Sequence, residues 1–292
     1  MNKPALQNKS DLLIESLSVV ADQYDYYMID IWGVLHDGVR PFTGTIDCLK
    51  NLKEQGKFVC LLSNTPSRGP DVVEDLAVFG ITRDLYDNIV TAGDSAFQAL
   101  KAYQGKRGWY AGNHAGAPLI KGLDIEVVGN PSDADFMIND LYDLSETEQR
   151  VVAPLLKEAA NKKLDMICGN PDLVVNVGNQ LKECPGTYAA LYETMGGNVI
   201  YHGKPHAPVY ETVWDLMGNP DKSKILAIGD SFHTDIHGAN NFGIDSAFHL
   251  VGIHWEEVRQ TRAPDEADPD KITAMVEKQK HKPTYALAAF CW

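Results

Sequence analysis

The sequence predicts an α/β fold in which a doubly wound, Rossmann-like parallel sheet carries a second α/β domain as an insertion. Three observations lead to this prediction. Short apolar runs alternate with amphipathic stretches of helical period almost throughout the 292 residues. The middle of the chain carries strands and a helix of its own. The first pattern then resumes towards the C-terminal end. The predicted core domain comprises residues 1–104 and 199–292, and the predicted inserted cap comprises residues 105–198.

The first part of the core begins with two runs that are typical of buried strands, residues 26–31 (YYMIDI) and 58–62 (FVCLL). Between them, residues 43–55 carry apolar side chains at helical spacing and are followed by a glycine, which predicts a helix. Residues 71–79 predict a second helix, and residues 88–91 a third strand. Strand, helix and strand in this order indicate parallel pairing.

The insertion and the last part of the core follow the same logic. In the core, residues 224–228 and 246–250 read as strands on either side of a helix that starts at about Thr234. Residues 264–270 are acidic and contain proline, which predicts a surface loop. The middle region has predicted strands at residues 107–111, 136–138, 164–168 and 173–177, and a helix at residues 146–160.

Composition excludes several classes of function. The net charge of −14 disfavours binding to nucleic acid or to anionic lipid. The five cysteines include no C-x-x-C pair, which fits a reducing compartment and not a disulfide scaffold. The N-terminus lacks the apolar core of a signal peptide, and no apolar run is long enough for a membrane span. We therefore expect a soluble, cytoplasmic protein, whose oligomeric state, including a homo-oligomer, stays open.

Four polar stretches stand at or just beyond predicted strand ends. They contain Asp30, the pair Ser63 and Asn64, Lys204 between a glycine and a proline, and Asp230 followed by Asp235. Taken singly, each has an ordinary explanation as a turn, a helix cap or a solvated lysine. Taken in order, they are what phosphoryl transfer needs. An aspartate attacks phosphorus, a hydroxyl and an ammonium hold the phosphate oxygens, and further acids complete a Mg²⁺ site.

This arrangement resembles the haloacid dehalogenase superfamily, whose four motifs match these residues. The insertion resembles the class II, subgroup A cap of nitrophenyl-phosphatase-like members, with similarity at residues 169–172 (GNPD) and 185–187 (PGT). The resemblance implies that Asp30 is the nucleophile and a Mg²⁺ ligand. It also implies that phosphate is bound by Ser63, Asn64 and Lys204. The remaining Mg²⁺ ligands would be the backbone carbonyl of Trp32, Asp230 and Asp235, the last as a direct ligand or a partner of one.

Trp32 departs from the family pattern. Phosphatases of this family usually carry an aspartate there, which protonates the leaving alcohol and later activates water. An indole has no titratable proton for either step. His36 and Asp37 lie nearby in the sequence, but a turn is expected to point them elsewhere. The loss of a positioned acid slows such chemistry by roughly 10²- to 10⁴-fold and does not abolish it.

The resemblance therefore implies a Mg²⁺-dependent phosphatase that hydrolyses a small phosphorylated metabolite, a sugar phosphate or a nucleotide, through an aspartyl phosphate. Two alternatives stay open. One is a phosphometabolite-binding or regulatory protein with little hydrolysis, favoured by Trp32. The other is a different phosphotransfer reaction of the superfamily. In the cap, residues 113–116 and the aromatic side chains of Trp109, Tyr110 and Tyr188 either contact the substrate or belong to a loop and to the cap core.

Overall fold

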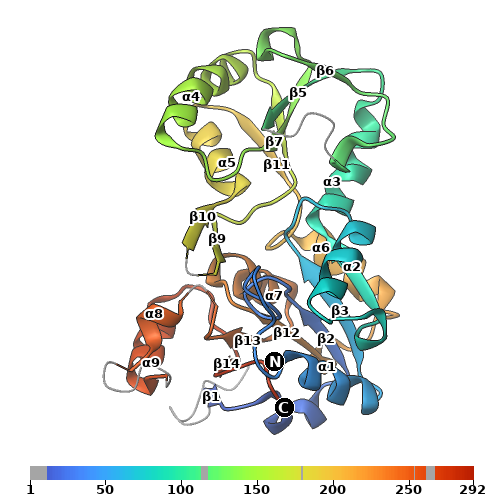
Figure 1. Ribbon diagram of the computed structural model, residues 1–292, viewed down its shortest axis with the longest axis vertical. Helices are drawn as coiled ribbons and strands as arrows, with labels where there is room; N and C mark the ends of the chain where they lie inside the picture. Colours follow the sequence, from blue (N-terminus) through green and yellow to red (C-terminus); the bar gives the residue numbers. More distant parts are fainter. Residues whose placement is uncertain (1–11, 113–117, 179, 253, 261–266) are drawn as a thin grey trace.

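The computed structural model describes residues 12–112, 118–178, 180–252, 254–260 and 267–292, and it consists of two lobes (Figure 1). The larger lobe contains a seven-stranded sheet in the order β1-β14-β13-β12-β2-β3-β4. Every pairing in this sheet is parallel. Its strands are β1 (Leu13–Ile14), β2 (Tyr26–Ile29), β3 (Phe58–Ser63), β4 (Asn88–Thr91), β12 (Ile225–Gly229), β13 (Asp245–His249) and β14 (Tyr285–Leu287).

Helices cover both faces of the core sheet. On one face, α1 (Thr45–Glu54) and α2 (Gly69–Val78) pack buried leucine and valine side chains against β2, β3 and β12. On the other face, α6 (Ala207–Leu216) and α7 (His237–Phe242) pack against the same strands. A strand that is buried on both faces needs an apolar residue at nearly every position, as the YYMI and FVCLL runs provide. The predicted doubly wound core is confirmed.

The smaller lobe, which we call the cap, is built on a five-stranded parallel sheet in the order β11-β8-β7-β5-β6. Its helices α4 (Glu146–Asn161) and α5 (Pro185–Thr194) pack on one face. The strands are β5 (Arg107–Gly112), β6 (Glu126–Val128), β7 (Phe136–Asp140), β8 (Asp165–Cys168) and β11 (Asn198–Tyr201). The last strand runs past residue 198, the predicted end of the insertion. The exact domain limits stay a prediction.

One helix of the core connects the two lobes. α3 (Ala92–Leu100) follows β4, and its side chains Ala96 and Leu100 are fully buried against the face of the cap sheet that α4 and α5 leave open. Tyr110, Ile138 and Ile167 of the cap contribute to the same cluster. The cap therefore depends on a core helix to complete its own hydrophobic interior.

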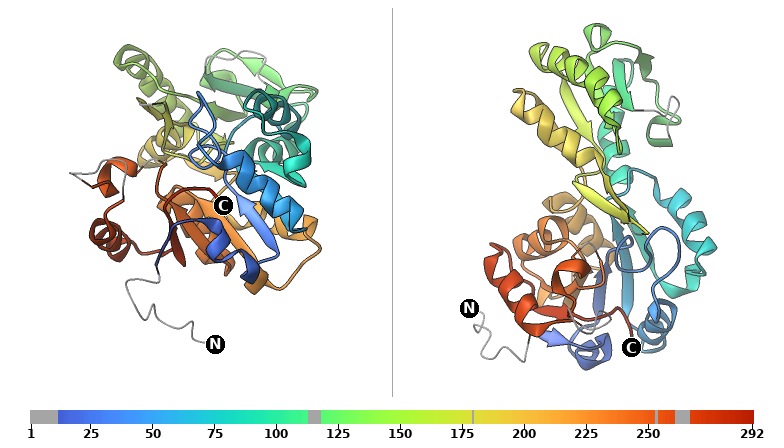
Figure 2. Two further views of the ribbon diagram at one scale, coloured as in Figure 1. Left: turned by 60° about the horizontal axis from the view of Figure 1, so that its bottom comes forward. Right: turned by 60° about the vertical axis from the view of Figure 1, so that its left-hand side comes forward.

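A two-stranded antiparallel hairpin of the cap, β9 (Val174–Val177) and β10 (Gln180–Glu183), lies between the lobes (Figures 1 and 2). It contacts the loop that follows β2, because the backbone N–H of Gly178 donates to the carbonyl of Asp37 at 2.9 Å. The turn of the cap hairpin is thus hydrogen-bonded to the loop beside the predicted nucleophile.

Near the C-terminal end, the prediction of a loop over residues 264–270 is wrong at its end. Residues 264–266 lie outside the described part of the chain, but α9 (Pro269–Lys278) already begins at Pro269. The side chain of Asp268 accepts hydrogen bonds from the backbone of Asp270 and Lys271, and proline occupies the first helical turn. An aspartate followed by proline marks a helix start here, although acidic residues and proline are also common in loops. A short α8 (Trp255–Val258) packs against α9.

Candidate active site

Two of the predicted aspartates lie side by side at the carboxyl edge of the core sheet. Asp30 directly follows β2 and Asp230 directly follows β12, the neighbouring strand. The backbone N–H of Asp30 donates to the carbonyl of Ile228 at 2.8 Å, which extends the strand pairing up to the carboxylate. Both side chains are buried. This edge is where open α/β sheets bind ligands.

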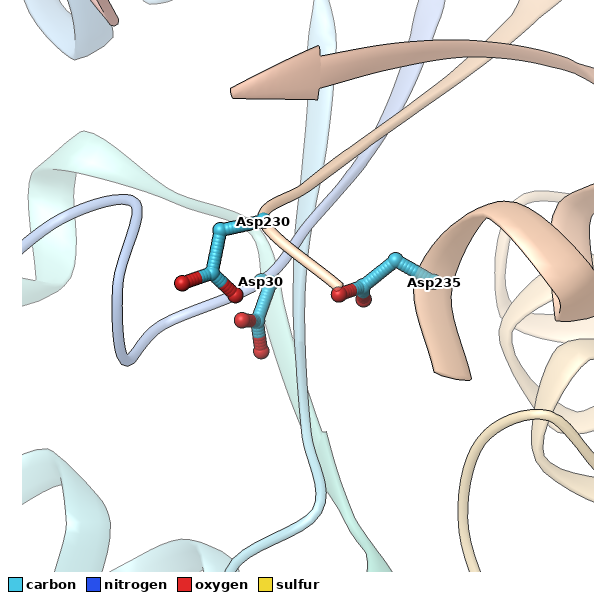
Figure 3. A group of neighbouring side chains, drawn as sticks. All are labelled: Asp30, Asp230 and Asp235. Atoms are coloured by element: carbon cyan, nitrogen blue, oxygen red, sulfur yellow. The ribbon is translucent and has the colours of Figure 1, made fainter. Parts of the chain in front are cut away.

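Asp235 completes the group from a wide helical turn at Phe232–Ile236, where the hydrogen bonds have π-helical spacing. Its Oδ2 accepts from the backbone N–H of Ser231 at 3.1 Å. Gly229 makes this approach possible, since a Cβ there would lie 2.0 Å from Cγ of Asp235. Figure 3 shows the three carboxylates converging from the end of β2, the loop after β12 and the start of this turn. Turns with π spacing are frequent at functional sites.

The three carboxylates form a group suited to a divalent cation. One ligand oxygen from each of Asp30, Asp230 and Asp235 lies within 4.8 Å of the others, and all three residues are buried. Three buried acids repel one another strongly unless positive charges balance them. Oxygen donors with no nitrogen or sulfur favour a hard cation over zinc or copper. The donor set and the shared burial therefore fit a divalent metal site.

Lys204 brings a positive charge to this group of carboxylates. Its Nζ lies 2.5 Å from Oδ1 of Asp30 and 2.8 Å from Oδ1 of Asp235. Burial alone would lower the pKa of Lys204, but the carboxylates of Asp235 and Asp30 raise it well above its ordinary value. Burial raises the pKa of Asp30, and the Lys204 charge acts in the opposite direction. Lys204 is therefore a permanent cation beside the predicted nucleophile.

Ser63 is the last residue of β3, the strand on the other side of β2, and Asn64 follows it. Both are buried and line the same cavity as Asp30. The Asn64 side chain is fully engaged. Its Oδ1 accepts from the backbone N–H of Lys204 at 2.7 Å, and its Nδ2 donates to the Lys204 carbonyl at 3.1 Å and to Oδ1 of Asp172 at 2.9 Å. Through these bonds Asn64 holds Lys204 in place and joins the core to the cap.

Trp32 has a role that the sequence did not indicate. Its indole N–H donates to the carbonyl of Asn176 in β9 at 2.5 Å, so the side chain connects the loop after Asp30 to the cap hairpin. The indole packs over Gly38, where an added Cβ would come within 2.4 Å of Cζ2 of the ring. It also lines the cavity above Asp30. Trp32 is therefore both a wall of the site and a contact between the lobes.

The two residues considered as substitutes for the missing acid lie elsewhere. His36 is buried, and its ring stacks on Phe79 at a centroid distance of 4.5 Å. Burial lowers the pKa of His36 to about 4, so it is neutral near pH 7. The carboxylate of Asp37 accepts hydrogen bonds from the backbone of Val39 and Arg40. Neither residue lines the cavity, as the predicted turn implied.

Sequence reasoning missed two supporting residues. The buried His249, at the end of β13, has its Nδ1 2.8 Å from the carbonyl of Gly33, directly after Trp32. Burial lowers the pKa of His249 to about 4, so Nδ1 carries the proton of a neutral ring and donates it to this carbonyl. Asp172 was noted only as part of a cap motif. In the sequence, the only feature that points to either residue is a polar side chain in or after a predicted strand. Many unrelated residues have the same feature.

A cavity of about 540 Å³ is lined by residues of both lobes, among them Asp30 of the core and Tyr110 and Asp140 of the cap. Tyr110 is thus the one member of its predicted aromatic group that reaches the cavity. Trp109 and Tyr188 are buried in the cap core instead. Residues 113–116, the other cap candidates, lie outside the described residues. A volume of this size holds a small metabolite.

The geometry defines a capped α/β protein with buried carboxylates at the edge of its core sheet, and comparisons with known proteins place it in a family. Two family models match, a haloacid dehalogenase-like hydrolase model over residues 27–126 and a HAD-hydrolase-like model over residues 201–285. A crystal structure of a haloacid dehalogenase-like hydrolase from Brucella suis is 31% identical, with a TM-score of 0.79, over 95% of this chain and 100% of that one.

Two further matches are more distant. D-glycerol 3-phosphate phosphatase of Mycobacterium tuberculosis is 28% identical over 257 residues, which cover 82% of this chain and 67% of the relative. A crystal structure of glycerol phosphate phosphatase from the same species, in complex with magnesium, shares the fold with a TM-score of 0.62 at 23% identity, over 91% of this chain and 78% of that one.

The chain belongs to the haloacid dehalogenase-like hydrolase family. This confirms the predicted superfamily and the predicted class of enzyme, a haloacid dehalogenase-like phosphatase. Across the part of the chain that the structure describes, no helix is long and apolar enough to cross a bilayer.

Proposed function

We propose that this protein is a Mg²⁺-dependent phosphatase that hydrolyses a small phosphomonoester through an aspartyl phosphate on Asp30. The observation that carries the proposal is the buried group of three aspartates, whose ligand oxygens lie within 4.8 Å, with Lys204 in contact with two of them. A substrate of the sugar phosphate, glycerol phosphate or nucleotide class fits the cavity volume and the names of the relatives.

Each residue has a distinct task in this proposal. Asp30, Asp230, Asp235 and the carbonyl of Trp32 would hold the Mg²⁺, which neutralises phosphate charge when bound. An oxygen of Asp30 attacks phosphorus while the bond to the leaving oxygen breaks. The Ser63 hydroxyl and the Lys204 ammonium donate to the phosphate oxygens as charge shifts. Water then releases inorganic phosphate and restores the Asp30 carboxylate.

The second candidate is a binding or regulatory protein that retains the site and hydrolyses little. The specific observation in its favour is that Trp32 occupies the place of the acid and also hydrogen-bonds to the cap. The carboxylate of Asp30 argues against this second candidate. A binding site for phosphate alone does not need a nucleophilic carboxylate, which repels the ligand.

Phosphate release from a panel of metabolite phosphomonoesters, with and without Mg²⁺, separates the two candidates. Asp30→Asn keeps the shape of the side chain but removes the anionic nucleophile, so turnover should vanish. Asp25→Asn is the matched control, because Asp25 lies at the opposite end of β2 and its side chain is 55% exposed. The phosphatase proposal is wrong if Asp30→Asn retains full turnover or if the parent releases no phosphate from any ester.

A further inference from the structure

A second cavity, of about 370 Å³, is also lined by residues of both lobes. The cap contributes residues 172–174, and the core contributes part of the wide turn at Phe232–Ile236 and residues 279–281, which follow α9. The second cavity shares four wall residues with the cavity at Asp30, namely Asp172, Val174, Ser231 and Thr234. The two cavities are therefore adjacent.

Basic side chains are concentrated on the walls of the second cavity. The rings of His237 and His281 stack at a centroid distance of 4.0 Å. Burial lowers the pKa of both histidines, and the charge of Lys280 acts in the same direction on each, so its ammonium group lies near the stacked pair. Four of the nine histidines of the chain and one lysine line this cavity, namely His233, His237, His254, His281 and Lys280.

These side chains have donors to offer a ligand. Lys280 is exposed, and it forms no hydrogen bond or ion pair with another described residue. Nδ1 of His254 lies 2.7 Å from Oε1 of Glu257, which leaves its Nε2 for a ligand. A neutral imidazole still donates through one ring N–H, so this donor set does not depend on the protonation of any histidine. The hydroxyl of Ser231 and the amide of Gln279 add donors on the same walls.

The charges around this cavity favour an anion over a metal ion. Among the described residues that line it, Asp172 is the only acid, and it accepts from Asn64 while burial raises its pKa. Within the described part of the chain, only the aspartates near Asp30 bring three metal-ligand atoms within 4.8 Å of one another. Lys280 would repel a cation and attract an anion.

We propose that the second cavity binds a small organic anion with two or more negative charges, carried by carboxylate or phosphate groups. This inference goes beyond the proposed function, because it depends neither on Asp30 nor on turnover. The volume suits a small metabolite, and hydrogen bonds from an ammonium group to anionic oxygens are stronger than neutral ones. The bound anion would lie against Ser231, whose backbone N–H holds the Asp235 carboxylate.

The test uses two probes that separate the two kinds of anion, tricarballylate for carboxylates and methylenediphosphonate for phosphates. Acetate is the singly charged control. Binding to the full chain is measured by calorimetry without Mg²⁺, because the aspartates near Asp30 then repel anions. At least one probe should bind at a single site about tenfold or more tighter than acetate. The affinity for tricarballylate should stay within about threefold when the chain is loaded with Mg²⁺, since this site needs no metal.

Lys280→Gln and His281→Gln should each weaken the binding of that probe by about tenfold, because each removes a donor to an anionic oxygen. Lys278→Gln is the matched control. It removes the same charge from an exposed lysine in the last turn of α9 that does not line the cavity, so the affinity should equal that of the parent.

Three results would overturn the inference. They are binding of both probes no tighter than that of acetate, an equal loss of affinity in Lys278→Gln and Lys280→Gln, and binding that requires Mg²⁺, which would place the anion at Asp30. Probe binding that Lys280→Gln weakens, in a chain that releases no phosphate from any ester, would contradict the phosphatase and support this second site.

Discussion

Replacement of Trp32 tests how the absence of an acid at that position affects the rate of hydrolysis. Among the described residues that line the cavity, none stands in the loop after Asp30 with a proton to give to the leaving oxygen. Esters with good leaving groups do not need that proton. The parent should therefore hydrolyse nitrophenyl phosphate roughly 10²- to 10⁴-fold faster than an alkyl phosphate, which is the contribution of a positioned acid.

Two variants separate the acid from the contact between the lobes. Trp32→Asp introduces an acid, so the ratio of nitrophenyl to alkyl turnover should fall by up to the same factor. Trp32→Phe introduces no acid, keeps an aromatic ring and loses the hydrogen bond to the Asn176 carbonyl. Such a bond contributes about 1 kcal/mol, so kcat/KM should drop about fivefold for both substrates while their ratio stays constant.

The assay compares the ratio of the two substrate classes within each variant, because removal of a large indole also disturbs packing and lowers absolute rates. A parent that hydrolyses alkyl and nitrophenyl esters equally fast would refute the reasoning, since an acid would then come from elsewhere. Asp172 would be the first residue to substitute in that case, because it lines the cavity and burial raises its pKa.

Further substitutions test the metal group, its backbone support, the lysine and the loop. Asp230→Asn should abolish the rise in melting temperature on adding Mg²⁺ and leave the metal-free protein as stable as the parent; an unchanged Mg²⁺ response places the ion elsewhere. Gly229→Ala forces Asp235 aside and should reduce kcat at least tenfold. The control Gly129→Ala, with no atom near its Cβ, should have no effect. Equal activities of the two variants would contradict the close approach of Asp235 to Gly229. Asn64→Ala should raise KM and lower kcat, each by about tenfold, because Lys204 loses both bonds to this side chain; parent-like kinetics would show that Lys204 needs no such support. The neutral His249 takes up no proton until about pH 4, whereas the same side chain in the unfolded chain does so below pH 6.5, so the free energy of unfolding should fall as the pH drops through this window. Because His36 has the same low pKa, His249→Gln should reduce this dependence without removing it, and an unchanged slope would mean that His249 does not cause it.

The sequence was sufficient for the parts of the fold that depend on local pattern. The apolar runs at β2, β3 and β12 identified the central strands, and the residues after them identified the aspartates. The strands β1 and β14, at one side of the core sheet, have two and three residues, too few for any periodicity to show. The supporting contacts of the site cannot be predicted from local sequence pattern for another reason. Asn64 bonds to residues 108 and 140 positions away, and the contact between Trp32 and Asn176 spans 144. Only the folded chain brings such pairs together.

The burial of α3 against the cap sheet limits how freely the two lobes can be exchanged. Ala96 and Leu100 belong to a core helix, yet they cover Tyr110, Ile138 and Ile167 of the cap. A cap excised at its sequence boundaries would leave this apolar face open to water, and we expect it to aggregate when expressed alone. A graft onto another core would have to carry α3 with it. The unit of recombination in this protein is therefore the insertion together with the helix that precedes it.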